Sequence, residues 1–155
     1  MAKKDERFSN IINIKNRRAS FEYEFIEKYV AGIQLLGSEI KSIREGKVNI
    51  TDAFCFVANE EVFVKNLHIT AYSNLSFNAP DPIRQRKLLL NKKEIRKIVA
   101  KTEEKGLTII PTRLFINDRG LAKLEIAIAK GKKIHDKRDS IKDKDMKREM
   151  DRIKY

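Results

Sequence analysis

The sequence predicts a mainly β protein, a closed antiparallel β-barrel with flanking α-helices and a disordered, basic C-terminal tail. Several short segments alternate apolar and polar residues and are separated by turn residues, which is typical of antiparallel strands. Two segments with helical spacing of apolar residues lie among them. Residues 130–155 contain no Phe, Trp, Leu or Val and hold eleven basic against six acidic side chains, so they cannot bury enough apolar surface to fold alone.

The first predicted elements are a strand and a short helix. Aromatic residues alternate with glutamates over residues 21–25, which predicts a half-buried strand that continues, bent, to Leu35. Ser38 is suited to cap a short helix whose isoleucines face inward, and Gly46 is suited to end it.

A hairpin and a loop follow. Residues 53–58 and 62–70 are apolar runs separated by Asn-Glu-Glu, which predicts two paired strands. Cys55 lies in the first run and is predicted to be a buried strand thiol of a reducing compartment. Residues 71–83 are rich in Asn, Ser and Pro and predict a loop.

The second half predicts one helix and two strands. Asn91, with Glu94 three residues later, is the signature of a capped helix start, and Gly106 follows the last helical turn. Residues 107–116 and 121–129 are apolar strands joined by a short turn.

The last strand alternates clearly, because Lys123 and Glu125 face one way and an apolar set faces the other: Ala122, Leu124, Ile126 and Ile128. A helix between the third and fourth of five strands is the order of the OB-fold, whose barrels commonly bind oligonucleotides on one face. We therefore expect a flexible basic N-terminus over residues 1–15, an OB-type barrel over 16–130 and the tail over 131–155.

The charge is large and unevenly distributed. The net charge is +12, which indicates a partner such as nucleic acid or an anionic surface. Residues 84–105 hold nine basic and three acidic side chains, whereas residues 19–83 hold five and nine. This segregation favours one docking face. The sequence shows no secretory signal and no membrane-spanning run, so we expect a cytoplasmic protein without a membrane partner.

Catalytic and metal-binding patterns are missing from the sequence. His68, His135 and Cys55 are far apart and have no zinc-ligand spacing. Glu22 and Glu24 share a strand face and are best explained as a solvated outer surface. We expect no metal, no cofactor and no enzymatic activity.

A basic cluster precedes the helix that begins at Asn91. Arg84, Arg86 and Lys87 lie beside a helix N-terminus, where free N–H groups and the helix dipole attract phosphate. Of the three residues Leu88–Leu90, two are expected to pack in the core. Asn91 can cap the helix with its side-chain oxygen and contact RNA with its amide.

The tail itself can become helical. Ser140-x-x-Asp143 is a cap signal, and an apolar stripe follows at approximately helical spacing: Ile141, Met146, Met150 and Ile153. Folding on a charged partner is one interpretation, and a permanently solvated tail is the other.

Three segments together resemble the SmpB (SsrA-binding protein) family. They are Gly37–Arg44 with Gly46–Ile50, the run RKLLLN at 86–91, and AKGKK at 129–133 followed by HDKR at 135–138. The similarity runs from about Asn16 to the end of the chain.

The resemblance implies an OB-type barrel that binds the tRNA-like end of transfer-messenger RNA (tmRNA) and delivers it to stalled ribosomes, with no catalytic role. It implies RNA contacts at Leu89, Asn91 and Lys123, and a basic entry to the barrel that contains Arg17 and Arg18. The partners implied are tmRNA, the small-subunit rRNA and, through charged tmRNA, elongation factor Tu.

The resemblance also implies that the tail enters the vacant mRNA channel as a helix. Its contacts in the decoding centre would be Lys132, Lys133, His135, Asp136, Lys137 and Arg138. One position departs from the family, because Val30 stands where many members have an RNA-binding Glu. The carboxylate contact is then lost or supplied elsewhere.

Two other functions remain open from the residues alone. Charge and fold also suit a general ribosome-associated or single-stranded RNA-binding barrel. The basic charge with His135 also suits an RNA hydrolase, although much less well.

Overall fold

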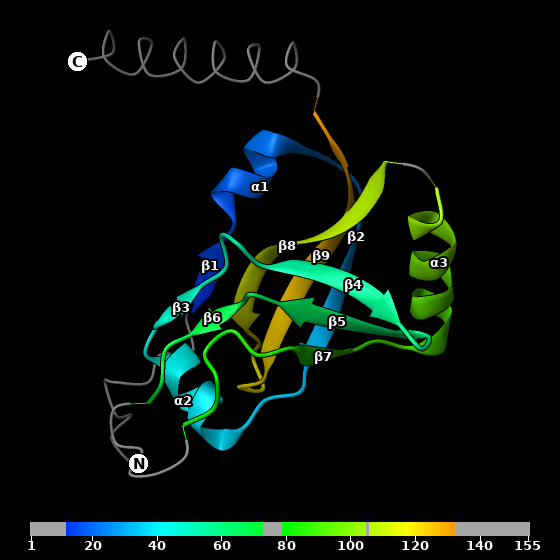
Figure 1. The fold of residues 1–155 in the computed structure, drawn as a ribbon. Coiled ribbons are helices and arrows are strands. Elements are labelled where there is room, and N and C mark those ends of the chain that lie inside the picture. The colour runs from blue at the N-terminus through cyan, green and yellow to red at the C-terminus, as the bar shows by residue number, and fades with distance from the viewer. Residues whose placement is uncertain (1–11, 73–78, 105, 133–155) are drawn as a thin grey trace, which may run out of the picture.

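The computed structural model describes residues 12–72, 79–104 and 106–132 (Figure 1). The elements in chain order are β1 (Asn13–Lys15), α1 (Arg17–Glu22), β2 (Tyr23–Ile33), α2 (Gly37–Arg44), β3 (Val48–Asn49), β4 (Phe54–Ala58), β5 (Glu61–Lys65), β6 (His68–Ile69), β7 (Arg86–Leu89), α3 (Lys92–Thr102), β8 (Leu107–Ile116) and β9 (Ala122–Gly131).

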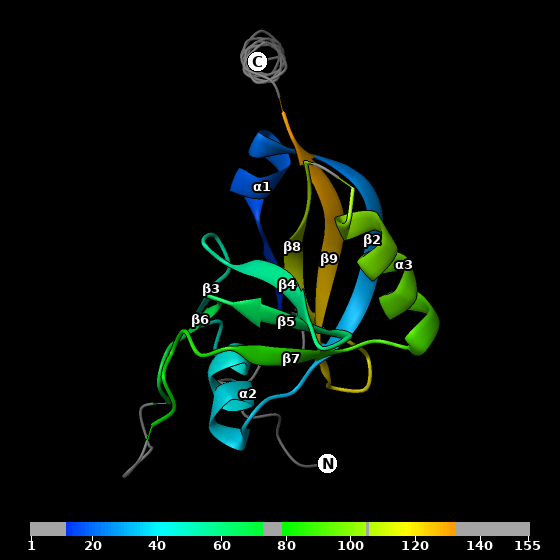
Figure 2. The same cartoon turned by 45° about the vertical axis from the view of Figure 1, so that its right-hand side comes forward.

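The main sheet returns on itself as a ring. Its strands pair antiparallel in the order β8, β4, β5, β7, β2 and β9, and β9 pairs again with β8. β1 adds to β8 beside the short β4 contact, and β3 pairs with β6 as a separate small sheet. The protein is therefore mainly β, and α1 and α2 lie at opposite ends of the ring while α3 runs along its side (Figures 1 and 2).

The core fills the inside of this ring. The inward residues of β9 predicted from the alternation, Ala122, Leu124, Ile126 and Ile128, are all buried. Ile43 of α2 and Ile98 of α3 are fully buried against the same core. Cys55 is buried in β4, as predicted, and burial raises the pKa of its thiol well above the ordinary range. A smaller apolar cluster of Ala19, Ile110 and Ala129 lies under α1.

The first predicted strand was placed too early, because residues 17–22 form α1 and β2 begins only at Tyr23. Asn16 explains the difference: its Oδ1 accepts from the Ala19 N–H at 3.1 Å, and its Nδ2 donates to the Pro111 carbonyl at 3.0 Å. Asn16 thus caps the helix and fixes it to β8. Tertiary contacts with β8 outweigh the local aromatic alternation.

Three further boundaries differ from the sequence predictions. The apolar run over 62–70 breaks after Lys65, where Asn66 has a φ of 61°, so its end pairs with β3 instead. Ser38 lies inside α2 rather than at its cap; residue Leu36 holds the cap position, and its N–H donates to Glu39 at 2.9 Å. Strand pairing begins at Asn13, earlier than the boundary expected at residue 16.

The strand β7 was not predicted from the sequence. The sequence pattern assigns its four residues, RKLL, only to a basic cluster and leucines before the helix, but they pair with β5 on one side and β2 on the other. These are long-range partners, so the local pattern carries no sign of them. The predicted helix start is confirmed, because Asn91 Oδ1 accepts from the Glu94 N–H at 2.8 Å.

Candidate nucleic-acid interface

One side of the ring presents a mixed surface of cations and apolar groups. Residues directly opposite in antiparallel strands project to the same side, so the register defines which side chains lie together. Gly32, Lys123, Phe115 and Asn13 form one row across β2, β9, β8 and β1. We call this surface the outer sheet face and define it by Lys15, Lys28, Val30, Gly32, Leu89, Arg113, Phe115, Lys123 and Glu125.

Gly32 lies at one end of the outer sheet face, between Leu89 and Lys123. A Cβ at this position would approach the Leu89 Cβ to 3.2 Å and the Lys123 Nζ to 3.7 Å. Leu89 and Lys123 therefore both lie next to Gly32, and the missing side chain leaves the Gly32 backbone accessible between them. A hollow of about 400 Å³ adjoins them, and Leu36, Arg44 and Leu121 also line it.

The three consecutive leucines separate by role, as predicted. Leu88 is buried at 1% exposure, and Leu90 packs partly against the core. Leu89 is 52% exposed. Leu36 and Leu121, which line the same hollow, are also exposed. A group of exposed leucines favours a contact with a partner.

Asn91 follows Leu89 at the start of α3 and is exposed. Its Oδ1 is occupied by the Glu94 N–H, and the Glu94 carboxylate accepts from the Asn91 N–H at 3.4 Å. No described residue accepts from its side-chain Nδ2. The amide can therefore cap the helix and still donate to an RNA group.

Two of the predicted phosphate ligands bind a buried carboxylate instead. Arg86 is buried, and its guanidinium donates to Glu39 through Nε at 2.7 Å and to the Leu67 carbonyl through Nη1 at 2.7 Å. Arg84 donates to the same carboxylate through Nε at 3.1 Å. Arg86 is buried and cannot reach a phosphate, and Arg84 shares the single Glu39 carboxylate with it, so we assign both to the architecture around β7.

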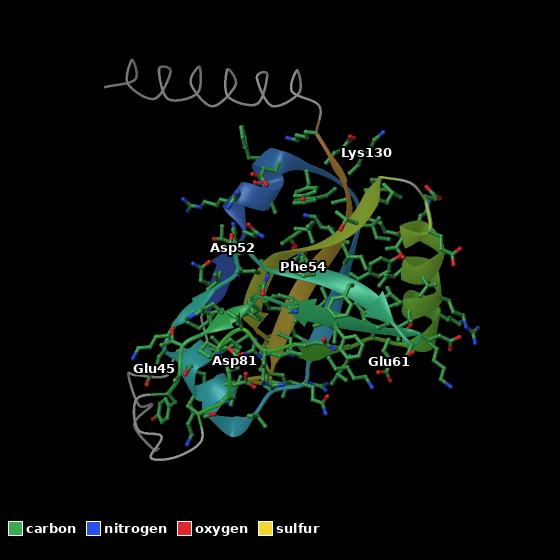
Figure 3. The ribbon with its side chains drawn as sticks, in the orientation of Figure 1. Glu45, Asp52, Phe54, Glu61, Asp81 and Lys130 are labelled. Carbon is green, nitrogen blue, oxygen red and sulfur yellow. The ribbon has the colours of Figure 1, made fainter. Side chains whose placement is uncertain are left out.

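Lys87 is more accessible than these arginines, but it pairs with Glu61 at 2.9 Å. Figure 3 shows Glu61 at the end of the hairpin that approaches α3. The three cations predicted over residues 84–87 are therefore all paired, with two acids that are distant in the sequence, Glu39 and Glu61.

Some of the other predicted cations form ion pairs or hydrogen bonds within the protein, and others do not. Arg18 donates to Glu22 at 3.0 Å and to Asp52 at 3.5 Å, and Figure 3 shows Asp52 beside α1. Arg17 is exposed and has no acid within ion-pair distance in the described residues. The Lys132 ammonium donates to the Ser20 carbonyl at 3.2 Å. Lys133, His135, Asp136, Lys137 and Arg138 lie outside the described residues.

Several residues of the outer sheet face were missed by sequence reasoning. Lys15, Lys28, Arg113 and Phe115 belong to three strands, and only the register brings them together. Arg113 lies over the Phe115 ring at 4.2 Å. Alternation in residues 107–116 could have indicated an outward Arg113, but its proximity to β1 is a tertiary property.

Within the described ranges, no group of His, Cys, Asp and Glu is placed to hold a metal ion. The same ranges contain no helix with the length and apolar character needed to span a bilayer.

A small, mainly β ring with flanking helices and one cation-rich outer face is the form of a protein that binds nucleic acid. The comparisons specify the family: the chain belongs to the SmpB family, because the family model described as SmpB protein matches residues 13–155.

The relatives and one solved structure agree with this family. An SsrA-binding protein of Christiangramia forsetii is 58% identical over 144 residues, which cover 93% of this chain and 92% of the relative. One from Cytophaga hutchinsonii is also 58% identical, over 92% of this chain and 94% of the relative. A chain in the solved structure described as "tmRNA-SmpB: a journey to the center of the bacterial ribosome" is 41% identical, with a TM-score of 0.69 over 86% of this chain and 95% of that one.

Proposed function

We propose that this protein binds tmRNA, the SsrA RNA, and delivers it to stalled ribosomes for trans-translation. The observation that carries the proposal is membership of the SmpB family along nearly the whole described chain. The relatives are SsrA-binding proteins, and the similar solved chain comes from a tmRNA–SmpB study of the ribosome. The protein acts as a cytoplasmic binding factor and not as an enzyme.

The RNA contact uses the end of the outer sheet face around Gly32. Lys123 supplies a cation, Leu89 an apolar contact to an unstacked base, and Asn91 a donor next to the free N–H groups of α3. Arg17, the first residue of α1, adds a further cation. If about six phosphates are contacted, the RNA affinity falls on the order of a thousandfold between 50 and 200 mM salt.

We infer that the strand ring is an OB-type barrel. The closed pairing of β8 with both β4 and β9 supports it, as does the position of α3 between β7 and β8. The barrel would bind the folded RNA on its outer face.

The basic tail would serve the ribosome. Residues 133–155 would gain order as a helix in the mRNA channel, and only when the channel is empty, because ordering must be offset by contacts with rRNA. Elongation factor Tu would join the complex through the charged tmRNA.

Recovery of RNA from cells tests the RNA proposal. The tagged protein should recover SsrA RNA as the dominant structured species, and excess homopolymer should not displace it. A broad spread of unrelated RNAs, displaced by homopolymer, would instead indicate the general RNA-binding function. Labelled RNA that loses its intact ends on incubation would indicate a hydrolase.

Truncation after Lys133 tests the division between the ring and the tail. The truncated protein should keep its affinity for SsrA RNA and lose the rescue of stalled ribosomes. A loss of RNA affinity of about tenfold or more (~1.4 kcal/mol) would show that the tail takes part in tmRNA binding.

A further inference from the structure

The far end of the outer sheet face contains a second hollow, distinct from the one beside Gly32. It has a volume of about 460 Å³ and lies where β1, α1, β2, β8 and β9 meet. The size is in the range of small-ligand sites. Val30 and Glu125, one row along the strands from Gly32 and Lys123, connect the hollow to the other end of the face.

The cations around this hollow are mostly uncompensated. Lys15, Arg17, Lys28 and Arg113 line it, against a single acid, Glu125. Lys15, Arg17 and Lys28 have no ion-pair partner among the described residues, and Lys28 lies over the Phe25 ring at 5.4 Å. Such a concave cluster attracts an anion, because opposing acids are too few to neutralise it.

The single acid is held in a fixed position. Glu125 Oε2 accepts from the Thr112 hydroxyl at 2.7 Å and lies 3.3 Å from the Arg113 Nε. The side chain is 17% exposed, and no described residue donates to its Oε1. Val30, directly opposite on β2, has no polar side-chain atom. Glu125 therefore presents an oriented, unused hydrogen-bond acceptor inside a cationic hollow.

A carboxylate among cations favours a ligand that carries both an anionic group and hydrogen-bond donors. It disfavours a bare phosphate beside it, but it accepts well from the N–H groups of bases and from ribose hydroxyls. A nucleotide has both parts, an anionic phosphate and these donors.

We propose that this hollow binds one nucleotide of the RNA, as a second contact on the same face. Lys15, Arg17 and Lys28 bind its phosphate, and Glu125 accepts a hydrogen bond from a base N–H or a ribose 2′-hydroxyl. The inference rests on the proposed function, since the RNA that reaches Lys123 continues across β9 and β8 to β1. It makes Glu125 a residue that determines specificity rather than a source of affinity for any polyanion.

The phosphate part is tested with charge-removing variants and SsrA RNA transcribed in vitro. Lys15→Gln and Lys28→Gln should each lower the slope of log Kd against log salt concentration by about 1. The matched control is Lys65→Gln, which removes an exposed charge from β5, across the ring, and should leave the slope unchanged. Equal changes in the test variants and the control would overturn the phosphate assignment.

The proposed role of Glu125 as an acceptor predicts the direction in which Glu125→Gln changes RNA affinity. General electrostatics alone says that Glu125→Gln strengthens RNA binding, because it removes a negative charge. We expect the opposite, a loss of about tenfold with an unchanged salt slope, because the amide is a weaker acceptor than the carboxylate. An unchanged or stronger affinity would overturn the assignment.

Modified RNA distinguishes the two possible donors. Pools of SsrA RNA with scattered 2′-deoxy or inosine-for-guanosine substitutions are selected on wild-type protein and on Glu125→Gln. A position that weakens binding only to the wild type identifies the donor, as a ribose hydroxyl in the first pool or a guanine amino group in the second. Interference that is the same for both proteins would contradict a ribose hydroxyl or a guanine amino group as the donor to Glu125, and the affinity of Glu125→Gln then decides for or against another base N–H. If the wild type fails to prefer SsrA RNA, the proposed function itself fails, which is a separate outcome.

Discussion

Glu39 and Arg86, 47 residues apart in the sequence, form a buried pair in which the Arg86 Nε lies 2.7 Å from the Glu39 Oε2. The same carboxylate accepts from Arg84 and from the Leu36 N–H, so it joins the start of α2 to the strand β7. Arg86 extends the junction to the carbonyls of Leu67 and Pro82. This network holds the strand that carries Leu89, and it removes two arginines from the set available to RNA.

Glu39→Gln should destabilise the fold strongly. It leaves the buried Arg86 charge without its partner, and breaking a buried pair costs about 3–5 kcal/mol. The matched control is Glu61→Gln, which breaks the more exposed pair with Lys87 and should cost at most about 1 kcal/mol. Urea unfolding measures both, and similar losses for the two variants would contradict the structural role of Glu39.

Acid should weaken the wild type more than the Glu39→Gln variant. Burial by itself would raise the pKa of Glu39, but hydrogen bonds from Arg84, the Leu36 N–H and Arg86 outweigh it and lower that pKa. A carboxyl with a lowered folded-state pKa stabilises the fold above its ordinary pKa of about 4.3, and loses that contribution as the pH falls through the folded value. Unfolding free energies between pH 7 and pH 3 should therefore fall more steeply for the wild type. Parallel pH curves would show that Glu39 does not titrate this way.

The neighbouring leucines provide a matched pair that separates folding from binding. Leu88→Ala removes a buried side chain and should lower the unfolding free energy by about 2–5 kcal/mol. Leu89→Ala removes an exposed one and should change stability by less than about 0.5 kcal/mol while weakening SsrA RNA binding. Thermal unfolding and an RNA-binding isotherm on both variants decide the matter. A stable Leu89→Ala protein with full affinity would remove Leu89 from the interface.

Gly32→Ala should disturb RNA binding through its neighbours. The new Cβ would lie 3.2 Å from the Leu89 Cβ, so Leu89 must shift by a few tenths of an ångström. We expect a several-fold loss of affinity for SsrA RNA with the unfolding temperature nearly unchanged. Gly131→Ala, at the other end of β9, where an added Cβ meets nothing within 4 Å, is the control. Equal affinities for the two variants would mean that the shape around Gly32 is unimportant.

The sequence predicted those parts of the fold that depend on local patterns. Alternation in residues 121–129 identified the outward Lys123, and the Asn91–Glu94 spacing identified the start of α3. It did not predict α1, because Asn16 acts through Pro111, 95 residues away. It did not predict β7, whose pairing partners are also distant.

The residues of the interface also divide into those that the sequence indicates and those that depend on tertiary contacts. The RKLLLN resemblance indicated Leu89, and the pairing of β7 explains its exposure, because a strand exposes alternate residues. Arg84 and Arg86 looked available because their partner Glu39 is 45 and 47 residues away in the sequence. Local charge density thus overestimated the cations on this surface, and strand register was needed to find Lys15, Lys28 and Arg113.

The affinity of Lys123→Ala for SsrA RNA, measured together with its unfolding temperature, tests the RNA-binding role of the outer sheet face most directly. Lys123 lies on the outer side of β9 next to Leu89, and its ammonium has no ion-pair partner among the described residues. We predict an affinity about tenfold weaker, a salt slope lower by about 1 and an unchanged unfolding temperature. Wild-type affinity in the folded variant would contradict RNA binding at this face.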